Sequence, residues 1–201
     1  MDLFHKSADF ETFAKILAEG LERYPVDLLA WCLMSNHWHL VLRPHRADAL
    51  GRMMGWVGVT HVRRHHAHYH TAGGGHLYQG RFKSFPVEDD RHFLTVCRYV
   101  EANPLRAEMV PAAEAWRWSS LGDRLSAEPV LATAEWPMDR PKNWTALVNQ
   151  SMKSSDVEAV RTSVNRGRPL GSAEWVKKTV KRLGLEYSVR PRGRPTTKNK
   201  E

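Results

Sequence analysis

Two histidines that are one residue apart are the side chains of this sequence best placed to hold a metal ion. His37 and His39 lie in the apolar stretch WCLMSNHWHLVLRP, residues 31–44. Side chains at positions i and i+2 of a strand point to the same face, about 7 Å apart, so both imidazoles can reach one divalent ion. The same spacing is compatible with a structural role, so by itself it leaves both readings open.

A tyrosine and an asparagine form a second candidate pair. Tyr99 and Asn103 are four residues apart, which is one turn of a helix expected over residues 88–102. A tyrosine can act as a nucleophile, and an asparagine oxygen is a ligand suited to Mg²⁺ or Mn²⁺. Taken alone, the pair is better explained by a packed tyrosine and by a helix stop at Asn103-Pro104.

The hydrophobic pattern predicts the elements that position these residues. An amphipathic helix is expected over residues 8–24, followed by a hairpin with strands at 26–34 and 37–43. In the second strand, alternation places one set of side chains on the histidine face (His37, His39, Val41 and Arg43) and another on the opposite face (Trp38, Leu40 and Leu42). Further along, the pattern predicts a helix at 47–68, a strand at 76–87, an irregular stretch at 116–145 and a small helix after Ser172.

Positive charge is concentrated in two parts of the chain. The net charge is +8; residues 161–201 carry 12 Lys and Arg against 3 Asp and Glu, and residues 43–87 carry seven against one. Neutralising a phosphate releases condensed counterions, so a concentrated basic region favours binding to nucleic acid. Basic residues kept only for solubility would be spread more evenly.

The cysteines and the apolar runs bear on the compartment. Cys32 and Cys97 lie in apolar segments and are interpreted as small core residues, which is typical of a reducing cytoplasm. No apolar run reaches membrane-spanning length, and the N-terminus lacks a signal-peptide pattern. We therefore expect a cytoplasmic, nucleoid-associated protein with no membrane partner.

Four motifs together resemble one known family. WCLMSNHWHLVLRP, LYQGRFKSFPV, FLTVCRYVEANPLRAEMV and WRWSSL occur in the order, and at about the spacing, of HUH single-tyrosine transposases, which include the IS200-like and REP-associated transposases. The resemblance covers residues 4–121 and is closest to the REP-associated branch. It matches His37-Trp38-His39 to the HUH metal motif.

The resemblance implies a fold, a reaction and a set of site residues. The fold is α+β, a ferredoxin-like antiparallel sheet with helices, here without the family's first strand because the sequence starts at MDLFHK. His37, His39 and Asn103 match the ligands of Mg²⁺ or Mn²⁺. Tyr99 matches the nucleophile that forms a 5′-phosphotyrosine and frees a 3′-OH in single-stranded DNA. The sequence contains no phosphate-binding loop, so no nucleotide energy source is expected.

The expected domains are a catalytic domain at 1–122, a linker at 123–160 and a basic DNA-binding extension at 161–201. Imperfect DNA hairpins are the typical substrates, and a homodimer is possible. The candidate DNA contacts are Arg63, Arg64, Arg81, Lys83, Arg192 and Arg194. The last two lie in PRGRP, which resembles an AT-hook core but equally fits a plain basic tail.

Several alternatives remain at this point. The histidines of HVRRHHAHYH, His61, His65 and His68 among them, mimic a metal site, but no carboxylate or cysteine accompanies them, and a basic DNA-facing helix explains them as well. The rival functions are a non-catalytic DNA-binding protein, a replication initiator or relaxase of the wider HUH group, and an RNA-binding ferredoxin-like domain. A single tyrosine with an asparagine four residues on favours the transposase.

Overall fold

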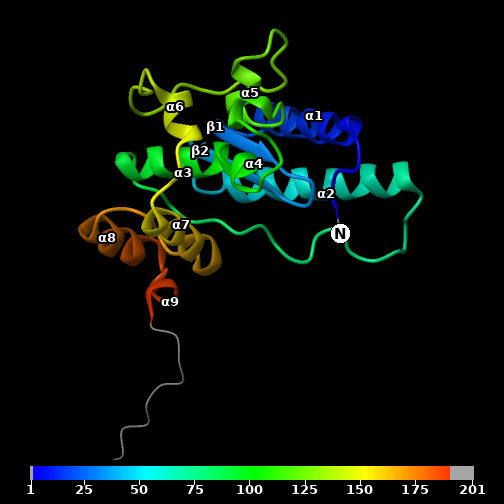
Figure 1. The fold of residues 1–201 in the computed structure, drawn as a ribbon. Coiled ribbons are helices and arrows are strands. Elements are labelled where there is room, and N and C mark those ends of the chain that lie inside the picture. The colour runs from blue at the N-terminus through cyan, green and yellow to red at the C-terminus, as the bar shows by residue number, and fades with distance from the viewer. Residues whose placement is uncertain (1, 191–201) are drawn as a thin grey trace, which may run out of the picture.

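The computed structural model describes residues 2–190, in which two antiparallel strands are surrounded by helices (Figure 1). The elements are α1 (Ser7–Arg23), β1 (Val26–Leu33), β2 (Trp38–Pro44), α2 (Ala49–Tyr69), α3 (Arg91–Glu101), α4 (Asn103–Arg106), the 3-10 helix η1 (Ala113–Ala115), α5 (Ser120–Arg124), α6 (Trp144–Asn149), α7 (Ser154–Arg166), α8 (Ala173–Leu183) and α9 (Glu186–Val189). This α+β arrangement agrees with the expected ferredoxin-like sheet that lacks a strand.

The hairpin register fixes which side chains face which helices. Leu33 pairs with Trp38, and Cys32 pairs with His39. Alternation then sends Trp31, Leu33 and Trp38 into a core shared with α1 and α2, whereas Cys32 packs in a second core with α3. The prediction that Trp38, Leu40 and Leu42 face away from His39 is confirmed, because all three pack against the core shared with α1 and α2.

Helix α1 begins at a cap that the Asp9 side chain forms. The Asp9 carboxylate accepts hydrogen bonds from the backbone N–H groups of His5, at 2.7 Å, and Lys6, at 3.1 Å. The buried face carries Phe13 and Leu17, which are spaced for a helix, and the helix ends shortly before Pro25. The helix predicted over residues 8–24 is therefore confirmed to within one residue at each end.

Helix α3 is held by a cap at its start and by a buried carboxylate at its end. The Asp90 side chain accepts the backbone N–H of His92 at 2.7 Å. Glu101 is fully buried and accepts hydrogen bonds from Ser120 Oγ, at 2.5 Å, and Trp144 Nε1, at 2.6 Å, and an ion pair with Arg124 completes its contacts. Later segments of the chain thus fix the helix.

The strand predicted over residues 76–87 is wrong. In the described structure this segment is irregular, with a single parallel bridge between Val87 and Leu170. Side chains hold it instead of a backbone ladder: Leu77 is buried, and the Tyr78 hydroxyl lies 3.3 Å from Trp38 Nε1. A β-strand needs a continuous partner for its backbone groups, and the segment has none.

The stretch predicted as irregular covers the free edge of β1. The Leu33 N–H donates to the Trp118 carbonyl at 2.8 Å, and Cys32 forms an antiparallel bridge with Ser119. Further along, the Ala134 N–H donates to the Leu28 carbonyl at 2.8 Å. Residues 116–136 therefore satisfy backbone groups that would otherwise be exposed at the edge of the sheet. The division into three domains stays a prediction.

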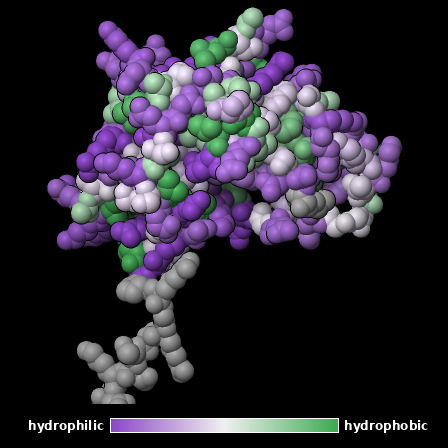
Figure 2. Space-filling view, in the orientation of Figure 1, coloured by the Kyte–Doolittle hydropathy of each residue, from purple (hydrophilic) through white to green (hydrophobic). Residues whose placement is uncertain are grey.

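The visible face of the molecule is mainly polar (Figure 2). None of the helices within residues 2–190 is long and apolar enough to cross a membrane. The face shown in Figure 2 is largely hydrophilic, with separate hydrophobic patches. In the orientation of Figure 1, α7, α8 and α9 gather below α3.

Candidate active site

The two histidines of the hairpin lie side by side on the face of the sheet that α3 covers. His37 lies at the exposed turn just before β2, and His39 lies within β2 and is partly buried. Their ring centroids are 4.9 Å apart, with the planes nearly perpendicular. The His37 Nδ1 atom lies 2.6 Å from Asn36 Oδ1, which leaves Nε2 to face the interior of the site.

Both imidazoles are held in the neutral form. Burial, and then the charges of His37 and Arg106, lower the pKa of His39 to about 3. Partial burial and the charge of Arg106 also lower the pKa of His37. A neutral imidazole keeps the lone pair with which histidine binds a metal, so the pair suits coordination at neutral pH.

The end of α3 and the start of α4 bring the second candidate pair to the histidines. Tyr99 is 9% exposed, and its ring centroid is 5.9 Å from that of His39. Asn103 is the first residue of α4, and its Nδ2 atom lies 3.4 Å from His37 Nε2. The structure therefore brings together the four residues that the sequence singled out: His37, His39, Tyr99 and Asn103.

Arg106 joins this group, although it was not among the candidate site residues predicted from the sequence. Its guanidinium carbon lies 4.0 Å from the Tyr99 ring centroid. One terminal nitrogen donates to Asn103 Oδ1 at 2.6 Å, and the other donates to the Tyr99 carbonyl at 3.3 Å. The signal in the sequence is its spacing: Arg106 follows Asn103 by three residues, which is one turn of the helix that begins there.

The residues present fit a divalent ion after one side-chain rotation. The amide oxygen of Asn103 is turned toward Arg106, and the amide nitrogen is turned toward His37. An ion is bound by the oxygen, so coordination by Asn103 together with both histidines requires the amide to turn over. Imidazoles favour a transition-metal ion and the amide oxygen suits Mg²⁺ or Mn²⁺, so of these two ions the donor set fits Mn²⁺ better.

The predicted DNA contacts are distributed over the molecule. Arg63 and Arg64 are exposed on α2, across the sheet from Tyr99, and Arg64 makes two 3.0 Å hydrogen bonds to Glu19. Arg81 and Lys83 are exposed on the irregular segment before α3. Arg192 and Arg194 lie outside the described residues.

The histidine cluster of α2 lies on the opposite side of the sheet from Tyr99. His61 is 3% exposed, and its Nδ1 atom lies 2.7 Å from the Tyr78 hydroxyl. His65 is also buried and packs against Tyr69, with ring centroids 4.7 Å apart. The structure also places a carboxylate near this cluster, which the sequence did not predict. Asp9 on α1 accepts a hydrogen bond from the Tyr69 hydroxyl at 2.7 Å.

A group of possible metal ligands also occurs at the start of α3. Within the part of the chain that the structure describes, ligand atoms of Glu88, Asp90 and His92 lie within 4.8 Å of one another. Each already has a partner: His92 Nδ1 lies 2.7 Å from Asp90 Oδ1, and Glu88 accepts the Ser172 backbone N–H at 2.6 Å. These contacts cap α3 and fix the approach to α8.

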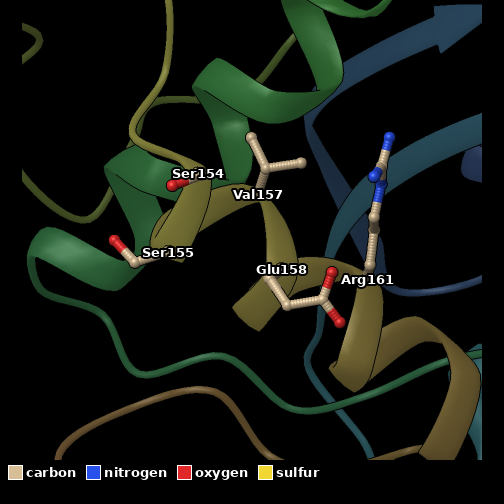
Figure 3. Close-up of a pocket in the computed structure, with 5 residues that line it drawn as sticks. All are labelled: Ser154, Ser155, Val157, Glu158 and Arg161. Carbon is tan, nitrogen blue, oxygen red and sulfur yellow. The ribbon is translucent and has the colours of Figure 1, made fainter.

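An open pocket lies on α7, next to the site. It has a volume of about 540 Å³ and is lined by Ser154, Ser155, Val157, Glu158 and Arg161 (Figure 3). Helix α7 packs on the α3 side of the sheet, where Val160 belongs to the same hydrophobic core as Tyr99. The Arg161 side chain extends from the helix toward the strands (Figure 3).

Comparison with known protein families identifies a match over the first half of the chain. The model of a family described as "Transposase IS200 like" matches residues 2–103, from the approach to α1 through Asn103. The match includes the positions of His37, His39, Tyr99 and Asn103, whereas Arg106 and α7 lie beyond it. No significant match was found among curated proteins or among solved structures.

Proposed function

The chain belongs to the IS200-like transposase family, and from this premise we propose that it cuts and rejoins single-stranded DNA at hairpin-flanked sites through a covalent bond to Tyr99. Membership of a transposase family implies that DNA is the partner. The observation that carries the finer proposal is the placement of Tyr99, whose ring lies 5.9 Å from His39 and one turn before Asn103.

We infer that His37, His39 and Asn103 hold Mg²⁺ or Mn²⁺. Two neutral imidazoles on one face of β2 and an amide 3.4 Å from His37 support this assignment. The bound ion would supply a positive charge that stabilises negative charge developing at the phosphate. The protein contributes the orientation, since β2 and α3 are both packed into one core.

The proposed reaction consists of two balanced exchanges. In the first, Tyr99 Oη bonds to the phosphorus of the scissile phosphodiester as the bond to the 3′-oxygen breaks. The phenol loses its proton to solvent, and the departing 3′-oxygen takes one up. In the second, a 3′-OH attacks the phosphotyrosine and releases Tyr99. Because one ester replaces another in each step, joining needs no outside energy source.

The remaining regions have proposed supporting roles. Residues 161–201 are proposed to bind DNA outside the catalytic residues, because they carry 12 Lys and Arg against 3 Asp and Glu. Arg81 and Lys83 are exposed on the segment before α3, where they can contact a DNA backbone. A homodimer also remains a proposal.

The test is whether a covalent protein–DNA adduct forms. The chain is incubated with Mn²⁺ or Mg²⁺ and single-stranded hairpin DNA from the flanks of its own gene, labelled at either end. We expect a denaturant-resistant band that keeps the 3′-end label and loses the 5′-end label. Tyr99→Phe and His39→Ala should abolish the band, while Tyr69→Phe, on the other side of the sheet, should retain it.

Two results would count against the proposal. A band that persists in Tyr99→Phe would assign the nucleophile to another residue. DNA binding without any band would favour a non-catalytic DNA-binding protein. Mn²⁺ binding, followed by electron paramagnetic resonance, tests the metal site separately: we expect His39→Ala to weaken it and Tyr99→Phe to retain it.

A further inference from the structure

Arg106 is a half-buried cation whose contacts are neutral. Its hydrogen bonds go to the Tyr99 carbonyl and to the amide oxygen of Asn103. Among residues 2–190, no carboxylate forms an ion pair with it, whereas Arg43, Arg52, Arg64 and Arg124 each have one. A charge that is partly removed from water is costly without a counter-ion, so this position favours binding of an anion.

A second arginine reaches the same region from α7. Arg161 is exposed and lines the open pocket of about 540 Å³. It forms no ion pair within the described chain, although Glu158 lies one turn before it and lines the same pocket (Figure 3). Arg161 directly follows Val160, which packs in the same core as Tyr99, and the Arg106 guanidinium lies over the ring of that tyrosine.

The packing of α7 against α3 holds the two arginines on the same side of the sheet. Tyr99 and Val160 belong to one hydrophobic core, so α7 is packed beside the C-terminal end of α3. Ser154 and Ser155, in the first turn of α7, add hydroxyl groups to the pocket wall. Hydroxyl and guanidinium groups are among the side-chain groups that contact nucleic-acid phosphates.

We propose that Arg106 and Arg161 form a phosphate-binding site that holds the backbone of single-stranded DNA beside Tyr99. The inference rests on the proposed function, and it adds to it a substrate-binding wall supplied by α7, outside the matched residues 2–103. Phosphates of the DNA strand act as counter-ions for the two guanidinium groups, neither of which forms an ion pair in the described chain. Glu158 opposes this binding and limits its strength.

The experiment measures DNA binding without catalysis. The full chain, in a buffer with a metal chelator, is titrated into a fluorescein-labelled oligothymidine of about 12 nucleotides, and anisotropy is followed over a series of salt concentrations. The variants are Arg161→Gln, Arg106→Gln and Glu158→Gln. The matched control is Lys15→Gln, which removes one positive charge from the exposed side of α1.

Two substitutions in α7 are expected to change DNA affinity in opposite directions. Arg161→Gln should weaken binding about two- to fivefold and lower the salt-dependence slope by about 0.7, the value for one lost phosphate contact in a single strand. Arg106→Gln should lower the slope similarly. Glu158→Gln should tighten binding, and Lys15→Gln should leave the slope unchanged.

The outcomes separate this inference from the proposed function. An unchanged slope in Arg161→Gln would overturn the phosphate site, even if the wild-type chain forms the covalent adduct. If Lys15→Gln lowers the slope as much as Arg161→Gln does, the phosphate site is also overturned, because the loss of any surface positive charge would then have the same effect. A selective loss in Arg161→Gln and Arg106→Gln supports the site, even where no adduct is detected and the catalytic proposal fails.

Discussion

At the scale of single residues, His61 couples the stability of the fold to pH. It is 3% exposed on α2, and its Nδ1 atom lies 2.7 Å from the Tyr78 hydroxyl. Burial, and then the neighbouring charge of His65, lower the pKa of His61 to about 4, although Asp9 acts in the opposite direction. The folded chain therefore keeps this imidazole neutral where the unfolded chain would protonate it.

We expect acid to destabilise the protein through His61. From pH 6.5 down to about 4, the unfolded chain binds a proton at this residue that the folded chain does not, so the free energy of unfolding falls. The full effect is about 3 kcal/mol. Denaturant unfolding of the metal-free protein across this range should show a shallower pH dependence for His61→Phe.

The matched control is His76→Gln, which changes an exposed histidine. It should leave the pH dependence of the wild type in place. If His61→Phe has the same pH dependence as the wild type, His61 is not the group responsible.

The histidines also show what residue-level prediction can and cannot find. The pairing of His37 with His39, and their approach to Tyr99 and Asn103, follow from strand alternation and helical spacing, and the structure brings the four together. The interpretation of HVRRHHAHYH as a DNA-facing helix misses the burial of His61 and His65. Their partner Tyr78 lies in an irregular segment, whose position no local pattern reveals.

At the scale of elements, α1 and α2 cross at a position that requires a glycine. A Cβ atom on Gly20 would lie 2.8 Å from Val57 Cγ2, closer than such atoms approach in proteins. Val57 is fully buried, and its branched side chain has little freedom to move. Close packing here sets how near α2 lies to α1.

We expect Gly20→Ala to lower the free energy of unfolding by about 1–3 kcal/mol, the usual cost of overpacking. This loss should outweigh the gain in helix propensity, which is at most about 1 kcal/mol. Denaturant unfolding measures the change, and the loss should shrink when Val57→Ala is already present. Gly51→Ala, at a position with open space around it, should be neutral or stabilising.

An equal response of the two glycines would show that the helices can move apart. Gly20→Ala would then show no specific loss of unfolding free energy, and a steric contact with Val57 would not limit how closely α1 and α2 pack.

The elements differ in how well local patterns predict them. α1, β1, β2 and α2 are bounded by caps, a turn and a proline, and the predicted bounds lie within two residues of those observed. The strand predicted at 76–87 fails because strand formation depends on a partner elsewhere in the chain. The bonding of residues 116–136 to the edge of β1 escapes prediction for the same reason.

At the scale of the whole molecule, the sheet divides the chain into two sides with different roles. One side carries α1, α2 and the buried histidine cluster, and the other carries α3 with Tyr99 and the pocket of α7. Glu101 links the second side together, because it holds α3 to Ser120, Arg124 and Trp144. The proposed DNA path therefore follows the α3 side and continues into the basic residues from 161 onward.

The last of these basic residues supply a prediction about duplex DNA. Arg192 and Arg194 lie outside the described residues, and the sequence PRGRP fits either an AT-hook core or a plain basic tail. We expect the double variant Arg192→Ala/Arg194→Ala to bind an AT-rich duplex more weakly than the wild type. Its salt-dependence slope should fall by about 1.8, the value for two phosphate contacts.

A GC-rich duplex of equal length distinguishes the two interpretations. An arginine inserted into the narrow minor groove of A·T sequence reads groove width, so an AT-hook predicts a loss confined to the AT-rich duplex. A basic tail contacts phosphates without regard to sequence and predicts equal losses on both duplexes. Anisotropy titrations of both duplexes at several salt concentrations measure this. Unchanged affinity for the AT-rich duplex would show that neither arginine contacts this DNA. Binding would then be attributed to the residues around α3 and α7.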